Sequence, residues 1–172
     1  ISFAIIKGAI KERTDAMLQL KNIVKQYKTG DTNADALNGV SLAFRKSEFV
    51  ILSTNDMHAS LDNMSRLATA VKKCRDTVFT IVVDAGDRWT GNAYVDLAEG
   101  RLPMIRLMNA VGYDVATLGN HDFDAGQKVL DEAIDKAEFE VVCANMESKS
   151  EWLDDVEKSV RVVTPEGVAV DF

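Results

Sequence analysis

The feature that most constrains this chain is a short apolar run that ends in polar side chains, a pattern that occurs three times. The three runs cover residues 49–54, 78–83 and 114–118. Apolar runs of about four to eight residues bounded by turn formers are typical of buried strands. Apolar residues at helical spacing follow each run, which is the order of elements in an α/β protein. The sequence therefore predicts an α/β fold with a mostly parallel sheet and right-handed crossovers.

The remaining elements follow from the same periodicities. Apolar residues at helical spacing are expected to be core positions of helices, and alternating ones to mark strands or hairpins. The predicted helices, fourth strand and C-terminal hairpin cover residues 61–71, 104–111, 130–137, 139–144 and 160–170.

The polar groups after the three runs contain side chains that bind metals or phosphates. They are Thr-Asn-Asp-Met-His at 54–58, Asp-Ala-Gly-Asp at 84–87 and Gly-Asn-His-Asp-Phe-Asp at 119–124. Parallel strands place their carboxyl ends at one edge of a sheet. We therefore expect one edge to carry Asp56, His58, Asp87, Asn120 and His121.

A simpler interpretation remains open for each group. Asp124 precedes a helical pattern with Gln127 three residues later, as in a capping box, so it could be a helix N-cap. Asp56, His58 and Asp87 could be ordinary loop and turn residues. Arg88 and Trp89 are expected to be surface or packing residues and not phosphate contacts.

The three motifs in this order, D-x-H, G-D and G-N-H-D, resemble those of the calcineurin-like metallophosphoesterases. Their longer forms look like the 5'-nucleotidase branch of that superfamily, over residues 49–146. The resemblance implies the N-terminal half of a metallophosphoesterase α/β sandwich, preceded here by a β-ribbon. It also implies a metal-dependent hydrolase whose substrate is a nucleotide or a related phosphomonoester.

The resemblance assigns a role to each motif residue. Asp56 and His58 would hold a first divalent metal, Asp87 would bridge two metals, and Asn120 would hold the second. His121 would protonate or polarise the leaving oxygen, and Asp124 would set its tautomer. Mixed nitrogen and oxygen ligands suit Zn²⁺, Mn²⁺ or similar ions.

The chain departs from the family in its histidines. Relatives add a G-H-x-H motif from later strands, whereas this chain has two histidines, both already assigned. Members of the family bind two metals. We expect this chain to bind one metal and to hydrolyse phosphoesters weakly. We expect a truncated N-terminal portion over residues 51–172 that lacks a C-terminal segment or partner chain.

Residues 17–50 resemble a different family, the start of an ABC-transporter ATP-binding domain. The resemblance rests on two strand-like stretches and on Ala-Leu-Asn-Gly-Val-Ser-Leu at 36–42. No phosphate-binding loop follows, and residues 86–93 have the glycine spacing of one without its lysine. Residues 1–16 form an unplaced leader whose apolar positions could be one stripe of a short helix. Alternative functions are therefore a nucleotide-binding fragment of a transporter or a non-catalytic truncated fusion.

Composition excludes some partners. A net charge of −7 argues against binding nucleic acid or an anionic membrane surface. No apolar run is long enough to span a bilayer.

The resemblance suggests the periplasm or cell envelope of a bacterium, but residues 1–10 show no signal peptide, so the location is unknown. Cys74 and Cys143 are expected to be buried free thiols and not a disulfide.

Overall fold

The structure is a computed structural model that describes residues 4–8, 16–29, 32–45, 49–147, 149, 151–154 and 156–172. The chain divides into two units. One comprises Gly8–Glu48, and the other combines Ile1–Lys7 with Phe49–Phe172.

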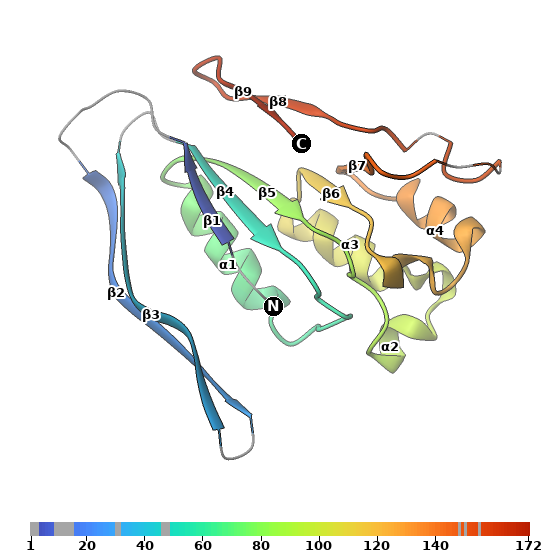
Figure 1. Ribbon diagram of the computed structural model, residues 1–172, viewed down its shortest axis with the longest axis horizontal. Coiled ribbons are helices and arrows are strands. Elements are labelled where there is room, and N and C mark those ends of the chain that lie inside the picture. Colours follow the sequence, from blue (N-terminus) through green and yellow to red (C-terminus); the bar gives the residue numbers. More distant parts are fainter. Residues whose placement is uncertain are drawn as a thin grey trace. The chain divides into compact units, whose positions relative to one another are not determined.

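The larger unit is built on a five-stranded sheet in the order β1-β4-β5-β6-β7 (Figure 1). Neighbouring strands from β4 to β7 are parallel, which confirms the predicted sheet. Thr54 pairs with Asp84, and Asp84 pairs with Ala116, so three strands end at nearly the same level. The strands are β1 (Ala4–Gly8), β4 (Phe49–Thr54), β5 (Phe79–Asp84), β6 (Val115–Thr117) and β7 (Glu140–Val142).

Three helices connect the parallel strands and supply the core. As predicted, their apolar positions are buried, among them Leu67, Met104, Met108 and Leu130. In Figure 1, α1 and α3 lie on the same face of the sheet. The helices are α1 (Met64–Arg75), α3 (Leu102–Val111) and α4 (Gln127–Ile134), with shorter turns α2 (Ala93–Asp96), η1 (Glu99–Arg101) and η2 (Asn120–Phe123).

The predicted C-terminal hairpin packs against the sheet. Strands β8 (Arg161–Val163) and β9 (Ala169–Asp171) pair antiparallel. Val162 and Phe172 pack against a buried cluster that contains Ile51 and Ile81. Side chains along a strand alternate between the two faces of the sheet. Val50 and Val82 therefore point to the face opposite the one that carries Ile51, Ile81 and the hairpin.

The smaller unit contains the predicted β-ribbon. Strand β2 (Ala16–Thr29) pairs antiparallel with β3 (Thr32–Arg45), with several register shifts. The pairing does not test the transporter resemblance, which stays a prediction.

The prediction of a short helix in the leader, residues 1–16, is wrong for the residues of the leader that the structure describes. Ala4–Gly8 form β1, which joins the sheet beside β4. A run with two adjacent isoleucines favours a strand once a partner edge is available. Residues 1–3 and 9–15 of the leader lie outside the described residues.

Two further expectations concern cysteines and membrane spans. Cys74 in α1 and Cys143 after β7 are both free thiols, as expected. Cys143 is buried as predicted, whereas Cys74 is only half-buried. Within the described ranges, no helix combines the length and apolar character needed to cross a bilayer.

Candidate metal centre

The candidate site lies where β4, β5 and β6 end, and backbone contacts join the loops that follow them. The backbone N–H groups of Asp56 and His58 donate to the carbonyl oxygens of Gly86 and Asp87, at 3.1 and 3.0 Å. These bonds join the first polar group to the second along the edge of the sheet.

Two glycines bring the second and third loops into contact. A Cβ atom on Gly86 would lie 2.4 Å from the backbone nitrogen of Gly119. A Cβ atom on Gly119 would lie 2.3 Å from Asp87 Oδ1. Only a residue without a side chain fits at either position, so both glycines serve close backbone approach.

Asp56, His58 and Asp87 offer one ligand atom each, and these atoms lie within 4.8 Å of one another. His58 Nε2 is 3.8 Å from Asp56 Oδ1, while the Asn55 amide donates to Asp56 Oδ2 at 2.6 Å. The backbone of all three ligand residues lies in the left-handed region, with φ of 48°, 44° and 55°. Non-glycine residues in this region are uncommon and cluster at functional sites.

His121 and Asp124 form a pair beside this cluster. His121 Nδ1 lies 2.9 Å from Asp124 Oδ2. This hydrogen bond raises the pKa of His121 above its ordinary value, and the charges of Asp124, Asp87 and Asp122 act in the same direction. The same bond, together with one from Thr90, lowers the pKa of Asp124.

The N-cap interpretation of Asp124 is wrong. Helix α4 begins at Gln127, and Gly126 occupies its N-cap position without a side-chain cap. Asp124 instead follows η2 and turns its carboxylate to His121 and Thr90. The chain needs two more residues to turn after η2, so the spacing that suggested a capping box does not match the helix start.

His121 also adjoins the cluster itself. Its backbone N–H donates to Asp87 Oδ1 at 2.8 Å, and its ring lies edge-on to that of His58 with centroids 5.2 Å apart. Asn120 is the preceding residue and is exposed at the start of η2. The geometry thus brings Asp56, His58, Asp87 and His121 together, with Asp124 behind His121 and Asn120 on the adjoining turn.

The sequence did not predict a cluster of buried charged side chains, Asp84, Arg88 and Asp122, beneath the loops. Asp122 accepts the backbone N–H groups of Asp87, Arg88 and Gly119, at 3.2, 3.2 and 2.8 Å. Its carboxylate also lies 3.7 Å from Arg88 Nη2. Asp122 and Arg88 have no exposed surface, so Arg88 is a packing residue and not a surface one. The available signal was the aspartate that ends G-N-H-D, which lies between the assigned His121 and Asp124.

Asp84, the last residue of β5, belongs to the same buried group. Arg88 Nε lies 3.4 Å from its Oδ1, and the Thr54 hydroxyl donates to its Oδ2 at 2.7 Å. Burial raises the pKa of Asp84, although Arg88 opposes that shift. Burial also raises the pKa of Tyr113, whose hydroxyl lies 2.8 Å from that of Thr54. Arg88 Nη2 contacts the carbonyl oxygen of Thr117, and Nη1 has no hydrogen-bond partner among the described residues.

The donor set fits a divalent cation. Two carboxylates and an imidazole nitrogen are ligands that Zn²⁺ and Mn²⁺ accept. Over the described part of the chain, this trio is the single group of three or more His, Cys, Asp or Glu ligands close enough to share an ion.

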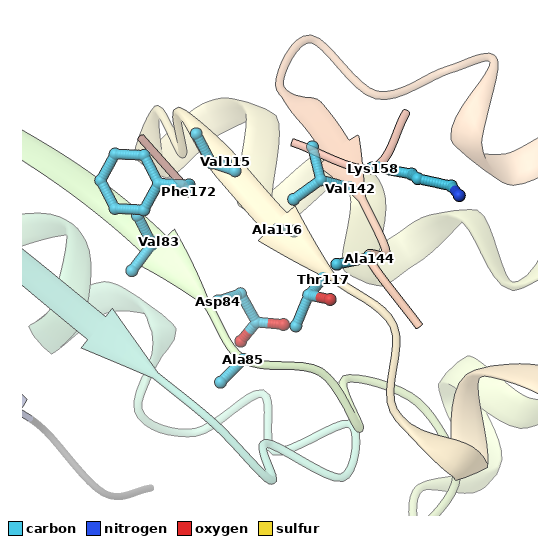
Figure 2. A pocket seen from close by; sticks show the side chains of 10 residues that line it. All are labelled: Val83, Asp84, Ala85, Val115, Ala116, Thr117, Val142, Ala144, Lys158 and Phe172. Carbon is cyan, nitrogen blue, oxygen red and sulfur yellow. The ribbon is translucent and has the colours of Figure 1, made fainter. Parts of the chain in front are cut away.

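Two cavities lie away from this centre. One of about 350 Å³ is lined by Ala93, Tyr94, Leu97 and Ala98. The other, of about 260 Å³, lies on the sheet, and Figure 2 shows Phe172 beside Val83 there, with Asp84 on its wall. Neither of these two cavities is lined by His58 or His121, and the side chains of His58 and Asp56 are 41% and 59% exposed.

Comparisons with known proteins agree with the geometry. The sequence model of the calcineurin-like phosphoesterases matches residues 49–166. The chain is 35% identical over 120 residues to the trifunctional nucleotide phosphoesterase protein YfkN of Bacillus subtilis, covering 60% of this chain and 8% of that protein. It is 32% identical over 126 residues to the 5'-nucleotidase of Bos taurus, covering 62% and 22%.

A solved structure has a similar fold. The 5'-nucleotidase precursor from Thermus thermophilus matches with a TM-score of 0.65 at 26% identity, over 70% of this chain and 27% of that one. The chain spans less than a quarter of the length of the two curated relatives above.

Proposed function

Because this chain belongs to the calcineurin-like phosphoesterase family, we propose that it carries the metal-binding half of a phosphomonoester hydrolase of 5'-nucleotidase type. The observation that carries the proposal is the convergence of Asp56, His58 and Asp87 within 4.8 Å, with the His121–Asp124 pair beside them. Nucleotides are the proposed substrates, because the names of the relatives refer to nucleotide phosphoester hydrolysis.

Asp56, His58 and Asp87 would hold one divalent cation. Such a cation, when bound, acidifies a water molecule and polarises a phosphoryl oxygen. The loop backbone contributes by holding the three ligand residues in left-handed conformations. This preorganisation reduces the reorganisation that binding would otherwise require.

His121 would act on the leaving oxygen of the phosphoester. A carboxylate only accepts hydrogen bonds, so the contact with Asp124 requires the proton on His121 Nδ1. The protonated ring can then donate from Nε2 to the leaving oxygen, and Asp124 stabilises the imidazolium. The raised pKa of His121 increases the fraction of protonated rings near neutral pH.

We expect this chain to bind one divalent ion well and to hydrolyse phosphoesters slowly. A second ion would share Asp87 and take Asn120, and both histidines of the chain already have other roles. One bridging carboxylate and one neutral amide are a poor ligand set for Zn²⁺ or Mn²⁺. Loss of one electrostatic clamp in a two-metal site typically costs orders of magnitude in rate.

The test is a metal titration combined with an assay. The chain is freed of metal with a chelator, titrated with Mn²⁺ or Zn²⁺ by calorimetry, and assayed with p-nitrophenyl phosphate and a nucleoside 5'-monophosphate. We expect one bound ion and slow turnover that requires metal and falls at least about 100-fold in His121→Ala. Glu132→Gln, an exposed change on α4, is the matched control and should keep the wild-type rate.

Two results would contradict the proposal. Turnover that is unchanged by the chelator or by His121→Ala would exclude the assigned chemistry. Absence of metal binding would favour the non-catalytic alternative. Two tightly bound ions with rapid turnover would contradict the one-ion expectation alone.

A further inference from the structure

Thr90 contacts the hydrogen-bond networks of both histidines through two different groups. Its carbonyl oxygen lies 3.1 Å from His58 Nδ1, and its hydroxyl donates to Asp124 Oδ2 at 2.7 Å. The same Asp124 oxygen accepts from His121 Nδ1 at 2.9 Å. One residue thus touches His58 directly and reaches His121 through one carboxylate.

Arg101 sets the direction of the Thr90 hydroxyl. Its Nη1 donates to Thr90 Oγ1 at 3.0 Å, and a guanidinium cannot accept a hydrogen bond. The one hydroxyl proton of Thr90 is therefore left for Asp124. Arg101 is itself held by Trp89, whose indole nitrogen donates to the Arg101 carbonyl oxygen at 3.1 Å. Trp89 has no exposed surface, so this anchor belongs to the core.

The backbone at Thr90 is held in an unusual conformation. Its φ is 65°, in the left-handed region that β-branched residues rarely adopt. The next residue, Gly91, donates its N–H to Asp96 Oδ2 at 3.0 Å, and a Cβ atom there would lie 2.7 Å from the His58 carbonyl oxygen. These contacts direct the Thr90 carbonyl at the His58 ring. Such conformations persist where the surroundings impose them, often at functional sites.

The contacts define the tautomer of each ring. A carbonyl oxygen only accepts, so His58 Nδ1 carries the proton and Nε2, which faces Asp56, is left with its lone pair. His121 Nδ1 likewise carries a proton toward Asp124. We propose that Thr90 is a positioning residue for both histidines. Its carbonyl sets the orientation and tautomer of His58 directly, and its hydroxyl holds the Asp124 carboxylate that sets those of His121. The catalytic consequence of this role rests on the proposed function, whereas the tautomers do not.

Two substitutions distinguish the role of the Thr90 hydroxyl from that of its carbonyl. Thr90→Val removes the hydroxyl and keeps the carbonyl and the branched shape, while Thr90→Ser keeps both groups. Thr69→Val is the matched control, because the Thr69 hydroxyl bonds only within α1, to the Ser65 carbonyl oxygen. The two histidines of the chain allow each ring to be assigned in ¹⁵N spectra of the metal-free protein.

At about pH 9, above the ordinary histidine pKa of about 6.5, we expect both wild-type rings to carry the proton on Nδ1. Thr90→Val should move the ¹⁵N shifts of His121 toward those of a free tautomer mixture and leave those of His58 in place. Thr90→Ser and Thr69→Val should match wild type. In the metal-loaded protein, Thr90→Val should lower kcat about 10- to 100-fold, the usual effect of losing such a supporting contact, with KM and metal affinity nearly unchanged.

Unchanged His121 shifts in Thr90→Val, or equal shifts in Thr90→Ser and Thr90→Val, would overturn the proposal. If Thr90→Val does not fold, Thr90→Ala lacks the same hydroxyl without a branched side chain and takes its place in the comparison. If wild type neither binds metal nor turns over substrate, the proposed function fails, and the spectra of the metal-free protein still decide the role of Thr90.

Discussion

Gly119 lies so close to Asp87 that the two loops exclude any side chain between them. A Cβ atom at Gly119 would meet Asp87 Oδ1 at 2.3 Å and the Asp87 backbone nitrogen at 2.6 Å. The glycine of one motif thus restricts the position of the Asp87 carboxylate in another. Asp87 belongs to the candidate metal centre, so this contact bears on the position of one of its three proposed ligands.

Gly119→Ala should therefore displace Asp87. We expect metal affinity to fall at least about 10-fold, as for loss of a supporting contact, and the free energy of unfolding to fall by about 1–3 kcal/mol through overpacking. Calorimetry and urea denaturation measure the two effects. Gly167→Ala is the control, since its φ of 82° carries backbone strain while nothing lies within 4 Å of its Cβ position. Equal metal affinity in the two variants would show that the contact does not position Asp87.

Asp122→Asn should destabilise the protein strongly. The variant removes one of the two buried carboxylates beside Arg88, leaving Asp84 as the other. It also places an amide where backbone N–H groups of both loops now donate. Removing one partner of a buried ion pair typically costs about 3–5 kcal/mol. Urea denaturation measures the change, with Glu132→Gln as the control, because that exposed pair with Lys128 should contribute less than about 1 kcal/mol. A loss as small as that of the control would mean that the buried group does not hold the loops together.

Asp124→Asn should lower the pKa of His121 in the metal-free protein. The Asp124 contact raises the pKa in the wild type, so the histidine titration seen by NMR should shift to lower pH in the variant. The folded-state pKa is raised, so the stability from this pair is complete below the ordinary histidine pKa of about 6.5 and is lost as pH rises through the folded value. The stability difference between wild type and variant should shrink over that rise. Asp171→Asn, which alters a hairpin ion pair, is the control and should leave the His121 titration in place.

Metal binding should raise the melting temperature. An ion that binds only the folded state stabilises it by about 2.7 kcal/mol at 100 times its Kd, or about 5–10 °C for a domain of this size. His58→Ala should remove most of this shift, because it takes away the single nitrogen ligand of the trio. Thermal unfolding with and without Mn²⁺ measures the shift, and a chelator should reverse it. A full shift in His58→Ala would place the ion elsewhere.

The sequence by itself determined the strand and helix order and the edge at which the motif loops meet. Apolar periodicity is a local property, and parallel strands bring their carboxyl ends to one edge regardless of detail. Asp56, His58 and Asp87 could therefore be named as a group before any coordinates. The roles given to these residues, to Asn120 and to the His121–Asp124 pair stay predictions.

Only the tertiary structure decided which way neighbouring side chains turn. Asp122 and Asp124 are two residues apart, yet one is buried on Arg88 and the other is exposed beside His121. That difference comes from the close packing of Gly86 on Gly119, a contact between residues 33 positions apart that no local spacing encodes. The strand at Ala4–Gly8 likewise needed the edge of β4, because a strand forms only where another chain segment completes its hydrogen bonds.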